Sequence, residues 1–191
     1  MLSDQGIQYA MIQKRLDITP FEQKQLNPAS YDVLLGNEFY VTRAEDIDRM
    51  RRKKEFIDPY VNNDNSFYFD RIDITRGSLV LEPGDFCLGV TKESVKLSKF
   101  LAASVSGKSS LARLGLTVHV TAGWIDPGFE GRITLEMFAL VPIKLTPGMP
   151  IAQLCFEEVP GGAFRPYAGR YSRANTVEMS KYYSGRERPM G

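Results

Sequence analysis

The chain has 191 residues, a length that favours one compact domain over residues 1–191 and argues against two separate domains. Hydrophobic residues make up 43% of it and charged residues 25%, which is enough for a core and ordinary for a soluble protein. Its 24 basic and 23 acidic residues give a net charge of +1, so no broad electrostatic field favours nucleic acid or a membrane surface as a partner. The sequence shows neither an apolar run long enough to span a bilayer nor a signal-peptide pattern, which predicts a cytoplasmic protein.

The N-terminal segment predicts a short helix. Ser3 is a typical N-cap residue, and helical spacing places three apolar residues on one face, namely Ile7, Met11 and Ile12. Pro20 stops any continuation of the helix. Residues 44–66 are polar and charged, and their pattern indicates no more than a helix followed by a loop.

From Ile72 onward the pattern indicates β-strands. Short alternating apolar segments are separated by turn signals such as Pro83-Gly84 and Pro147-Gly148. Strands of this kind predict an all-β fold, either an antiparallel barrel or a sandwich. In residues 161–191 apolar residues thin out while Arg, Tyr, Ser and Gly accumulate, which predicts a disordered tail or a flexible C-terminal flap.

The stretch 106–136 carries most of the candidate chemistry. It begins with a basic, hydroxyl-rich turn, Gly107-Lys108-Ser109-Ser110, which Arg113 follows, and it ends with the carboxylates Asp126 and Glu136. Such a turn can hold phosphate through backbone N–H groups, hydroxyls and a lysine charge, which predicts a small phosphate-bearing ligand. The frame of a Walker A loop is absent, and a plain polar turn is an equally good interpretation of this motif alone.

Glu136 lies in the middle of an expected strand. Period-2 alternation gives it the same face as Arg132 and Thr134, opposite to an apolar face. A solvent-exposed outer face is the simple interpretation, but the presence of Thr134 and Phe138 there favours the wall of a cavity. Burial in such a wall would raise the pKa of the carboxylate and suit it to proton transfer near neutral pH.

Four other residues of this stretch have both a structural and a functional interpretation. Asp126 either closes a Pro-Gly turn through its side chain or presents a carboxylate to a ligand hydroxyl. Trp124 and Phe129 either pack in the core or lie against a sugar or base. His119, the only histidine, favours a structural role with its ring nitrogens hydrogen-bonded.

Three segments carry a family resemblance that covers most of the chain. They are Pro28-Ala29-Ser30-Tyr31-Asp32-Val33-Leu34-Leu35-Gly36, the central stretch from Ser109-Ser110-Leu111-Ala112-Arg113 through Thr121-Ala122-Gly123-Trp124-Ile125-Asp126-Pro127-Gly128-Phe129 to Leu135-Glu136, and Pro147-Gly148-Met149-Pro150-Ile151-Ala152-Gln153-Leu154. In these segments the chain resembles the dCTP deaminase family of the dUTPase-like superfamily. The resemblance implies an all-β distorted barrel or jelly roll, the dUTPase-like β-clip, with a short N-terminal helix and a C-terminal flap. It also implies a homotrimer with active sites at subunit interfaces.

The resemblance implies a role for each candidate site residue. Glu136 would activate water for attack on cytosine C4 and pass protons toward leaving ammonia. Ser109, Arg113 and the backbone carbonyl of Ala122 would orient the water and the base, and Asp126 would accept the deoxyribose 3′-hydroxyl. The other implied substrate-binding residues are Lys108, Ser110, Trp124, Ile125, Phe129, Thr134, Leu135, Gln153, Tyr167 and Arg170. Mg²⁺ would arrive on the triphosphate, without ligands from the protein.

The cysteines do not match the pattern of a zinc-dependent deaminase. Those enzymes take their ligands from an H-x-E and a P-C-x-x-C motif. Here Cys87 and Cys155 lie far apart in apolar strand-like segments, and the chain has a single histidine. We expect two buried free thiols, although the spacing is also compatible with a disulfide. If the chain deaminates cytosine, catalysis by a carboxylate base remains as the route, without zinc.

The expected reaction is deamination of dCTP to dUTP and ammonia in pyrimidine deoxynucleotide metabolism. A first alternative continues at the same site to dUMP and pyrophosphate, because Gly123-Trp124 is a pairing that the resemblance associates with bifunctional members. A second is a pure dUTPase, and a third is a regulatory nucleotide-binding homologue without turnover. Two differences from the family pattern favour keeping the regulatory homologue as an alternative. Family members commonly have Arg at the position of Lys108 and Gln at the position of Ala174. The resemblance also makes feedback inhibition by dTTP plausible.

Overall fold

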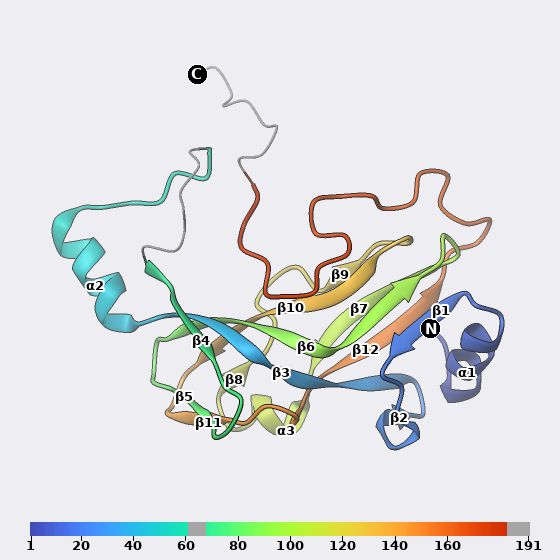
Figure 1. Cartoon of the computed structure of the whole chain (residues 1–191), viewed down its shortest axis with the longest axis horizontal. Coiled ribbons are helices and arrows are strands. Elements are labelled where there is room, and N and C mark those ends of the chain that lie inside the picture. The colour runs from blue at the N-terminus through green and yellow to red at the C-terminus, as the bar shows by residue number, and fades with distance from the viewer. Residues whose placement is uncertain (61–67, 183–191) are drawn as a thin grey trace.

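The computed structural model describes residues 1–60 and 68–182 of the chain. Within these ranges ten strands form one curled sheet in the order β8-β10-β6-β3-β12-β7-β9, with β1, β2 and β4 attached beside it, and β5 pairs with β11 (Figure 1). The strands are β1 (Leu16–Thr19), β2 (Leu26–Asn27), β3 (Ser30–Thr42), β4 (Asp70–Asp73), β5 (Leu79–Leu81), β6 (Phe86–Leu97), β7 (Leu101–Gly107), β8 (Leu116–Thr117), β9 (Trp124–Ile125), β10 (Glu130–Ala139), β11 (Ile143–Leu145) and β12 (Pro150–Glu158). The α-helices are α1 (Asp4–Ile12), α2 (Ala44–Lys53) and α3 (Ser109–Ala112), and a short 3-10 helix, η1, spans Gln23–Gln25. The predicted all-β class is confirmed.

The longest strand, β3, joins the two halves of the sheet. Its first part pairs with β12, as at Tyr31 opposite Leu154, whereas its last part pairs with β6, as at Thr42 opposite Phe86. Both pairings are antiparallel. A strand that changes partners along its length turns the sheet back on itself, so that one face encloses the core.

Apolar alternation along the strands builds that core. In β10 the burial alternates residue by residue, and Ile133, Leu135 and Met137 are at most 7% exposed. These side chains belong to one apolar cluster that extends from α1 to β12. The predicted alternation of this strand is therefore confirmed, and it leaves Thr134 and Glu136 on the outer face.

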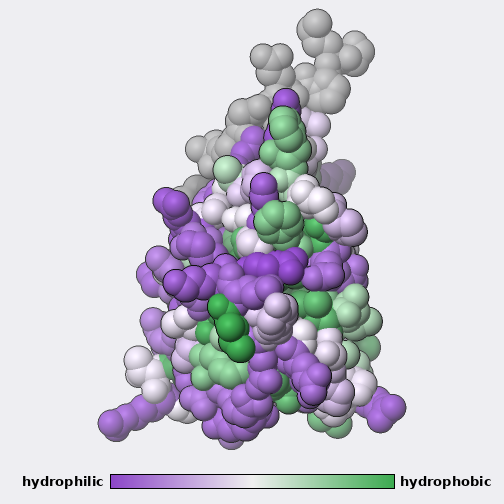
Figure 2. All heavy atoms as spheres, turned by 90° about the vertical axis from the view of Figure 1, so that its right-hand side faces the viewer, coloured by the Kyte–Doolittle hydropathy of each residue, from purple (hydrophilic) through white to green (hydrophobic). Residues whose placement is uncertain are grey.

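The predicted N-terminal helix forms, and two of the three apolar residues expected on one face, Ile7 and Met11, meet the core. The side chain of Ser3 accepts from the N–H of Gly6 at 3.2 Å, as an N-cap does. Ile7 and Ala10 are buried, whereas Ile12 is 77% exposed, so the prediction that Ile12 shares a face with Ile7 and Met11 was wrong. Figure 2 shows the side of the molecule that carries α1, where hydrophobic side chains form small groups among hydrophilic ones.

The polar segment 44–66 begins with the helix that its pattern indicated. Asp85 accepts from the guanidinium of Arg43 at 2.8 Å and from the N–H of Ala44 at 3.1 Å, which fixes the start of α2. Residues 61–67 lie outside the described part of the chain. None of the helices in the described ranges is long and apolar enough to cross a bilayer.

Both cysteines are free thiols, and they differ in accessibility. Cys87 is fully buried in β6, and burial raises the pKa of its thiol far above the ordinary value, whereas Cys155 is half-buried. We therefore expect iodoacetamide to leave Cys87 unmodified in the native protein, because only an accessible thiolate reacts. Peptide mass spectrometry of native and guanidinium-denatured samples measures this protection. Labelling of Cys87 at the same rate in both samples would contradict it.

Candidate active site

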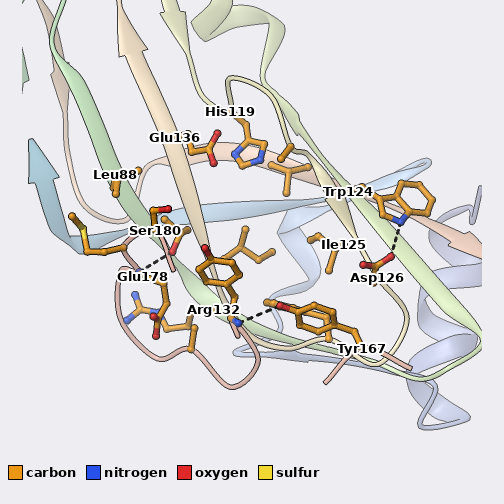
Figure 3. Close-up of a pocket in the computed structure, with 18 of the residues that line it drawn as sticks. Leu88, His119, Trp124, Ile125, Asp126, Arg132, Glu136, Tyr167, Glu178 and Ser180 are labelled. Carbon is orange, nitrogen blue, oxygen red and sulfur yellow. Dashed lines mark hydrogen bonds between the residues drawn. The ribbon is translucent and has the colours of Figure 1, made fainter. Parts of the chain in front are cut away.

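A pocket of about 570 Å³ opens on the outer face of β10. Its walls come mainly from β10 itself, the segment 118–129, β6 with the neighbouring residues 68–69, and the C-terminal segment 167–180. Figure 3 shows Asp126 and Leu88 toward opposite ends of the pocket, with Glu136 between them. The site residues predicted from the sequence that line it are Ala122, Trp124, Ile125, Asp126, Phe129, Thr134, Glu136 and Tyr167.

Glu136 reaches the pocket because it occupies an outward-facing position of β10. It lies opposite Leu88 of β6, and in Figure 3 its carboxylate points toward the ring of His119. Thr134, two residues earlier on the strand, faces the same way and lines the same pocket. The interpretation of this face as a cavity wall is confirmed.

A tight turn presents the carboxylate of Asp126. The main chain closes this turn, since the N–H of Phe129 donates to the carbonyl oxygen of Asp126 at 3.2 Å. Gly128 has a φ of +93°, and a Cβ there would lie 2.7 Å from the Cβ of Pro166, so only glycine fits. The Asp126 carboxylate accepts from the indole Nε1 of Trp124 at 3.2 Å and lines the pocket. The side chain is therefore available to a ligand and is not the group that closes the turn.

His119 lies in the pocket wall, with its ring in an unusual environment. Both ring nitrogens are buried, and neither has a hydrogen-bond partner among the described residues. The prediction that its ring nitrogens are hydrogen-bonded is therefore wrong. The only signal for this position in the sequence was that it holds the single histidine of the chain.

The C-terminal segment supplies a wall of the pocket, of which the sequence predicted Tyr167 but not the residues after it. The N–H of Tyr167 donates to the carbonyl oxygen of Pro127 at 2.7 Å, and its ring lies 6.2 Å from that of Phe129. Further along, the N–H of Glu178 donates to Oγ1 of Thr134 at 3.0 Å. The lining residues that the sequence did not predict include Tyr171, Ala174, Glu178, Met179 and Ser180 on this wall, and Tyr68, Phe69, Phe86 and Leu88 from the other side.

The charges around the pocket are mostly negative. Three carboxylates line it, those of Asp126, Glu136 and Glu178, whereas Arg132 is the only lysine or arginine among its described lining residues. The guanidinium of Arg132 donates to the carbonyl oxygens of Thr91 at 2.6 Å and Asn175 at 3.0 Å, and burial lowers its pKa. The pocket of one chain therefore offers few groups for a polyanion.

The predicted anion-binding turn lies outside this pocket. Ser109 begins α3, and both it and Arg113 at the other end of the helix are exposed. Lys108 precedes the helix and forms an ion pair with Asp32 at 2.5 Å. The side chain of Leu135 is fully buried in the core, so only its main chain could meet a ligand. The predicted site residues that do not line the pocket are Lys108, Ser109, Ser110, Arg113, Leu135, Gln153 and Arg170.

Comparison with known proteins identifies the family. The sequence model described as dCTP deaminase-like matches residues 1–159. The dCTP deaminase, dUMP-forming, of Nanoarchaeum equitans (strain Kin4-M) is 41% identical over 163 residues, which cover 81% of this chain and 82% of that protein. The protein of the same description from Leifsonia xyli subsp. xyli (strain CTCB07) is 41% identical over 191 residues, covering 99% of this chain and 88% of that one.

A solved structure supports the fold. The crystal structure of 2′-deoxycytidine 5′-triphosphate deaminase from Agrobacterium tumefaciens superimposes with a TM-score of 0.63 at 24% identity. The match covers 83% of this chain and 47% of that chain, so this chain spans about half the length of that protein. At this level of identity the likeness concerns the fold, and the family assignment comes from the sequence matches. The chain belongs to the dCTP deaminase-like family.

Proposed function

We propose that this protein deaminates dCTP and converts the product at the same site into dUMP and pyrophosphate. The observation that carries the proposal is one pocket that holds the Glu136 carboxylate between the Asp126 turn and an apolar wall. The relatives are described as dUMP-forming, which favours this bifunctional alternative over the expected release of dUTP. The pairing Gly123-Trp124 is consistent with it.

In the proposed deamination Glu136 acts as the proton-transferring group. It takes a proton from water as the water oxygen bonds to cytosine C4, and the proton is passed to the exocyclic nitrogen. The C4–N bond then breaks, ammonia leaves with the bonding electron pair, and the second water proton passes from the C4 oxygen to N3 as the C4 carbonyl of uracil forms. Ser109, Arg113 and the carbonyl oxygen of Ala122 orient the water and the base. The half-buried position of Glu136 suits a carboxylate that must both accept and return a proton.

In the proposed second step the deoxyribose is held at the Asp126 end of the pocket. The Asp126 carboxylate accepts the 3′-hydroxyl and helps to position the hydrolytic water, while the sugar lies against Ile125, Phe129 and Trp124. Water attacks the α-phosphorus, and the bond from that phosphorus to the oxygen bridging to the β-phosphate breaks. The products are dUMP and pyrophosphate.

The proposed substrate is the magnesium complex of the triphosphate, because three of the four charged side chains that line the pocket among the described residues are carboxylates. Mg²⁺ reduces the negative charge that approaches them. The remaining proposed contacts follow the family resemblance. Thr134 and the main chain of Leu135 would meet the base, and the triphosphate would meet Lys108, Ser110, Gln153, Tyr167 and Arg170.

We further propose that the active site is completed by a second copy of the chain in a homotrimer. Ser109 and Arg113 are exposed on α3 and do not line the pocket that contains Glu136. An exposed pair of a hydroxyl and a guanidinium can reach the pocket of a neighbouring copy, as symmetric assemblies allow. This arrangement would bring a second guanidinium to the pocket, where Arg132, the one lysine or arginine among the described lining residues, already donates to the carbonyl oxygens of Thr91 and Asn175.

Product analysis tests the function. We expect purified protein with dCTP and Mg²⁺ to release ammonia, dUMP and pyrophosphate in equal amounts, with little free dUTP, because both steps use one site. Ion-exchange separation of nucleotides beside an ammonia assay measures this outcome. Accumulation of dUTP would contradict the second step and show that the protein only deaminates dCTP. Tight dCTP binding by calorimetry without any product would contradict the proposal and favour a regulatory homologue.

A further inference from the structure

The C-terminal segment 173–179 runs along β10 and is bonded to it through the main chain. The N–H of Arg173 donates to the carbonyl oxygen of Glu130 at 2.5 Å, and the N–H of Arg132 donates to that of Ala174 at 2.7 Å. Gly131 and Ala174 thereby form an isolated parallel bridge. A Cβ at Gly131 would lie 2.8 Å from the nitrogen of Ala174, so the approach requires glycine.

Two charged side chains hold the same segment from either side. Arg132 uses Nε on the carbonyl oxygen of Thr91 at 2.6 Å and a terminal nitrogen on that of Asn175 at 3.0 Å. Glu38, which is 8% exposed in β3, accepts from the N–H of Val177 at 3.2 Å. Charged groups that bond main-chain atoms in a half-buried setting give strong and directional attachments. Arg132 and Glu38 therefore act as a clasp on residues 175 and 177.

Apolar packing reinforces the clasp. Ala174 is 4% exposed and Val177 is 5% exposed. Val177 forms a small apolar cluster with Leu88 and Val90 of β6, separate from the main core, and Met179 packs against it. Burial of this extent is typical of a fixed wall and is not expected of a loop tip.

We propose that Arg132 and Glu38 are positioning residues, which fix segment 173–179 as a permanent wall of the active-site pocket. This inference rests on the proposed function for its catalytic consequence. The wall includes Ala174, Glu178 and Met179, which line the pocket, and it places the N–H of Glu178 on Thr134. Ala174, where the family commonly has a phosphate-contacting glutamine, thus belongs to the wall. If a flap within residues 161–191 moves, segment 173–179 is then not the part that moves.

A double-mutant cycle in the full-length protein tests the clasp. Arg132→Lys keeps the charge but loses the forked attachment to Thr91 and Asn175, and Val177→Ser weakens the apolar anchor. We expect each single substitution to speed tryptic cleavage after Arg173 and to lower kcat/KM for dCTP about 10- to 100-fold, because displaced pocket walls misalign substrate. The double variant should be little worse than the more affected single variant, because both changes release the same segment. Arg165→Lys, an exposed position at the start of the tail, is the matched control.

The outcomes separate the clasp from its alternatives. Fully additive losses in the double variant would mean that Arg132 contacts substrate directly, which overturns the positioning role. Unchanged tryptic cleavage in both single variants would overturn the clasp itself. If the wild-type protein fails to deaminate dCTP, the proposed function fails, while the cleavage rates still decide whether the clasp exists. Thermal unfolding of each variant identifies any that lose the fold, and Glu38→Gln then replaces such a variant in the cycle.

Discussion

Replacing Glu136 by Gln is expected to abolish ammonia release from dCTP while leaving the hydrolysis of added dUTP largely intact. Gln has nearly the same shape as Glu but cannot accept a proton from water, so the deamination step loses its base. The loss in kcat for deamination is expected to be about 10²- to 10⁴-fold, the usual contribution of general acid–base catalysis. Hydrolysis at the α-phosphorus is proposed to depend on Asp126, so it does not need a carboxylate at position 136. Separate ammonia and pyrophosphate assays measure the two steps.

Glu130→Gln is the matched control for this substitution. Glu130 begins the same strand, and its side chain forms an ion pair with Lys96 at 3.1 Å without lining the pocket. The same chemical change there should leave both activities near the wild-type rate, since exposed ion pairs contribute little to stability. Equal loss of both activities in the Glu136 variant would contradict the division of roles. Full retention of ammonia release would contradict the assignment of Glu136 as the base.

The sequence was most informative where a local pattern decides the structure. Strict alternation along β10 predicts which residues enter the core, and the buried set Ile133, Leu135 and Met137 follows it. The same alternation placed Glu136 on the face of the strand that carries Thr134. The residues of that face favoured a cavity wall over a fully solvated surface. The Pro-Gly turn at 127–128 likewise predicted a tight connection before this strand. These features depend on neighbours within a few residues.

The failures concern contacts between distant residues. The bridge between Gly131 and Ala174 joins positions with no shared periodicity, and Val177 is too isolated in the sequence to predict burial. The sequence therefore indicated that segment 173–179 is part of a polar tail, although its main chain forms hydrogen bonds with Glu130 and Arg132 of β10. His119 was misjudged for a related reason. Alternation predicts which way a side chain points, but it does not predict whether a partner for its ring nitrogens lies across the fold.

The exposed position of Ser109 and Arg113 leads to the second prediction. In a site confined to one chain, these groups would have to line the pocket of Glu136, and they do not. If neighbouring copies complete each other's pockets, a copy that lacks its base and a copy that lacks its guanidinium carry complementary defects. One pocket in a mixed assembly then combines an intact Glu136 from one copy with an intact Arg113 from the next.

We therefore expect Glu136→Gln and Arg113→Ala proteins to be inactive in deamination when pure, and to regain activity when co-assembled. In a randomly mixed homotrimer at equal amounts, about one quarter of the interface sites would combine the two intact groups. Reversible denaturation and reassembly of the mixture, followed by the ammonia assay, measures the recovery. Mixing the assembled proteins without denaturation is the control and should give none. Mass spectrometry establishes whether the two variants have co-assembled. If they have and no activity returns, each active site belongs to a single chain. A site confined to one chain does not depend on which copy lies beside it.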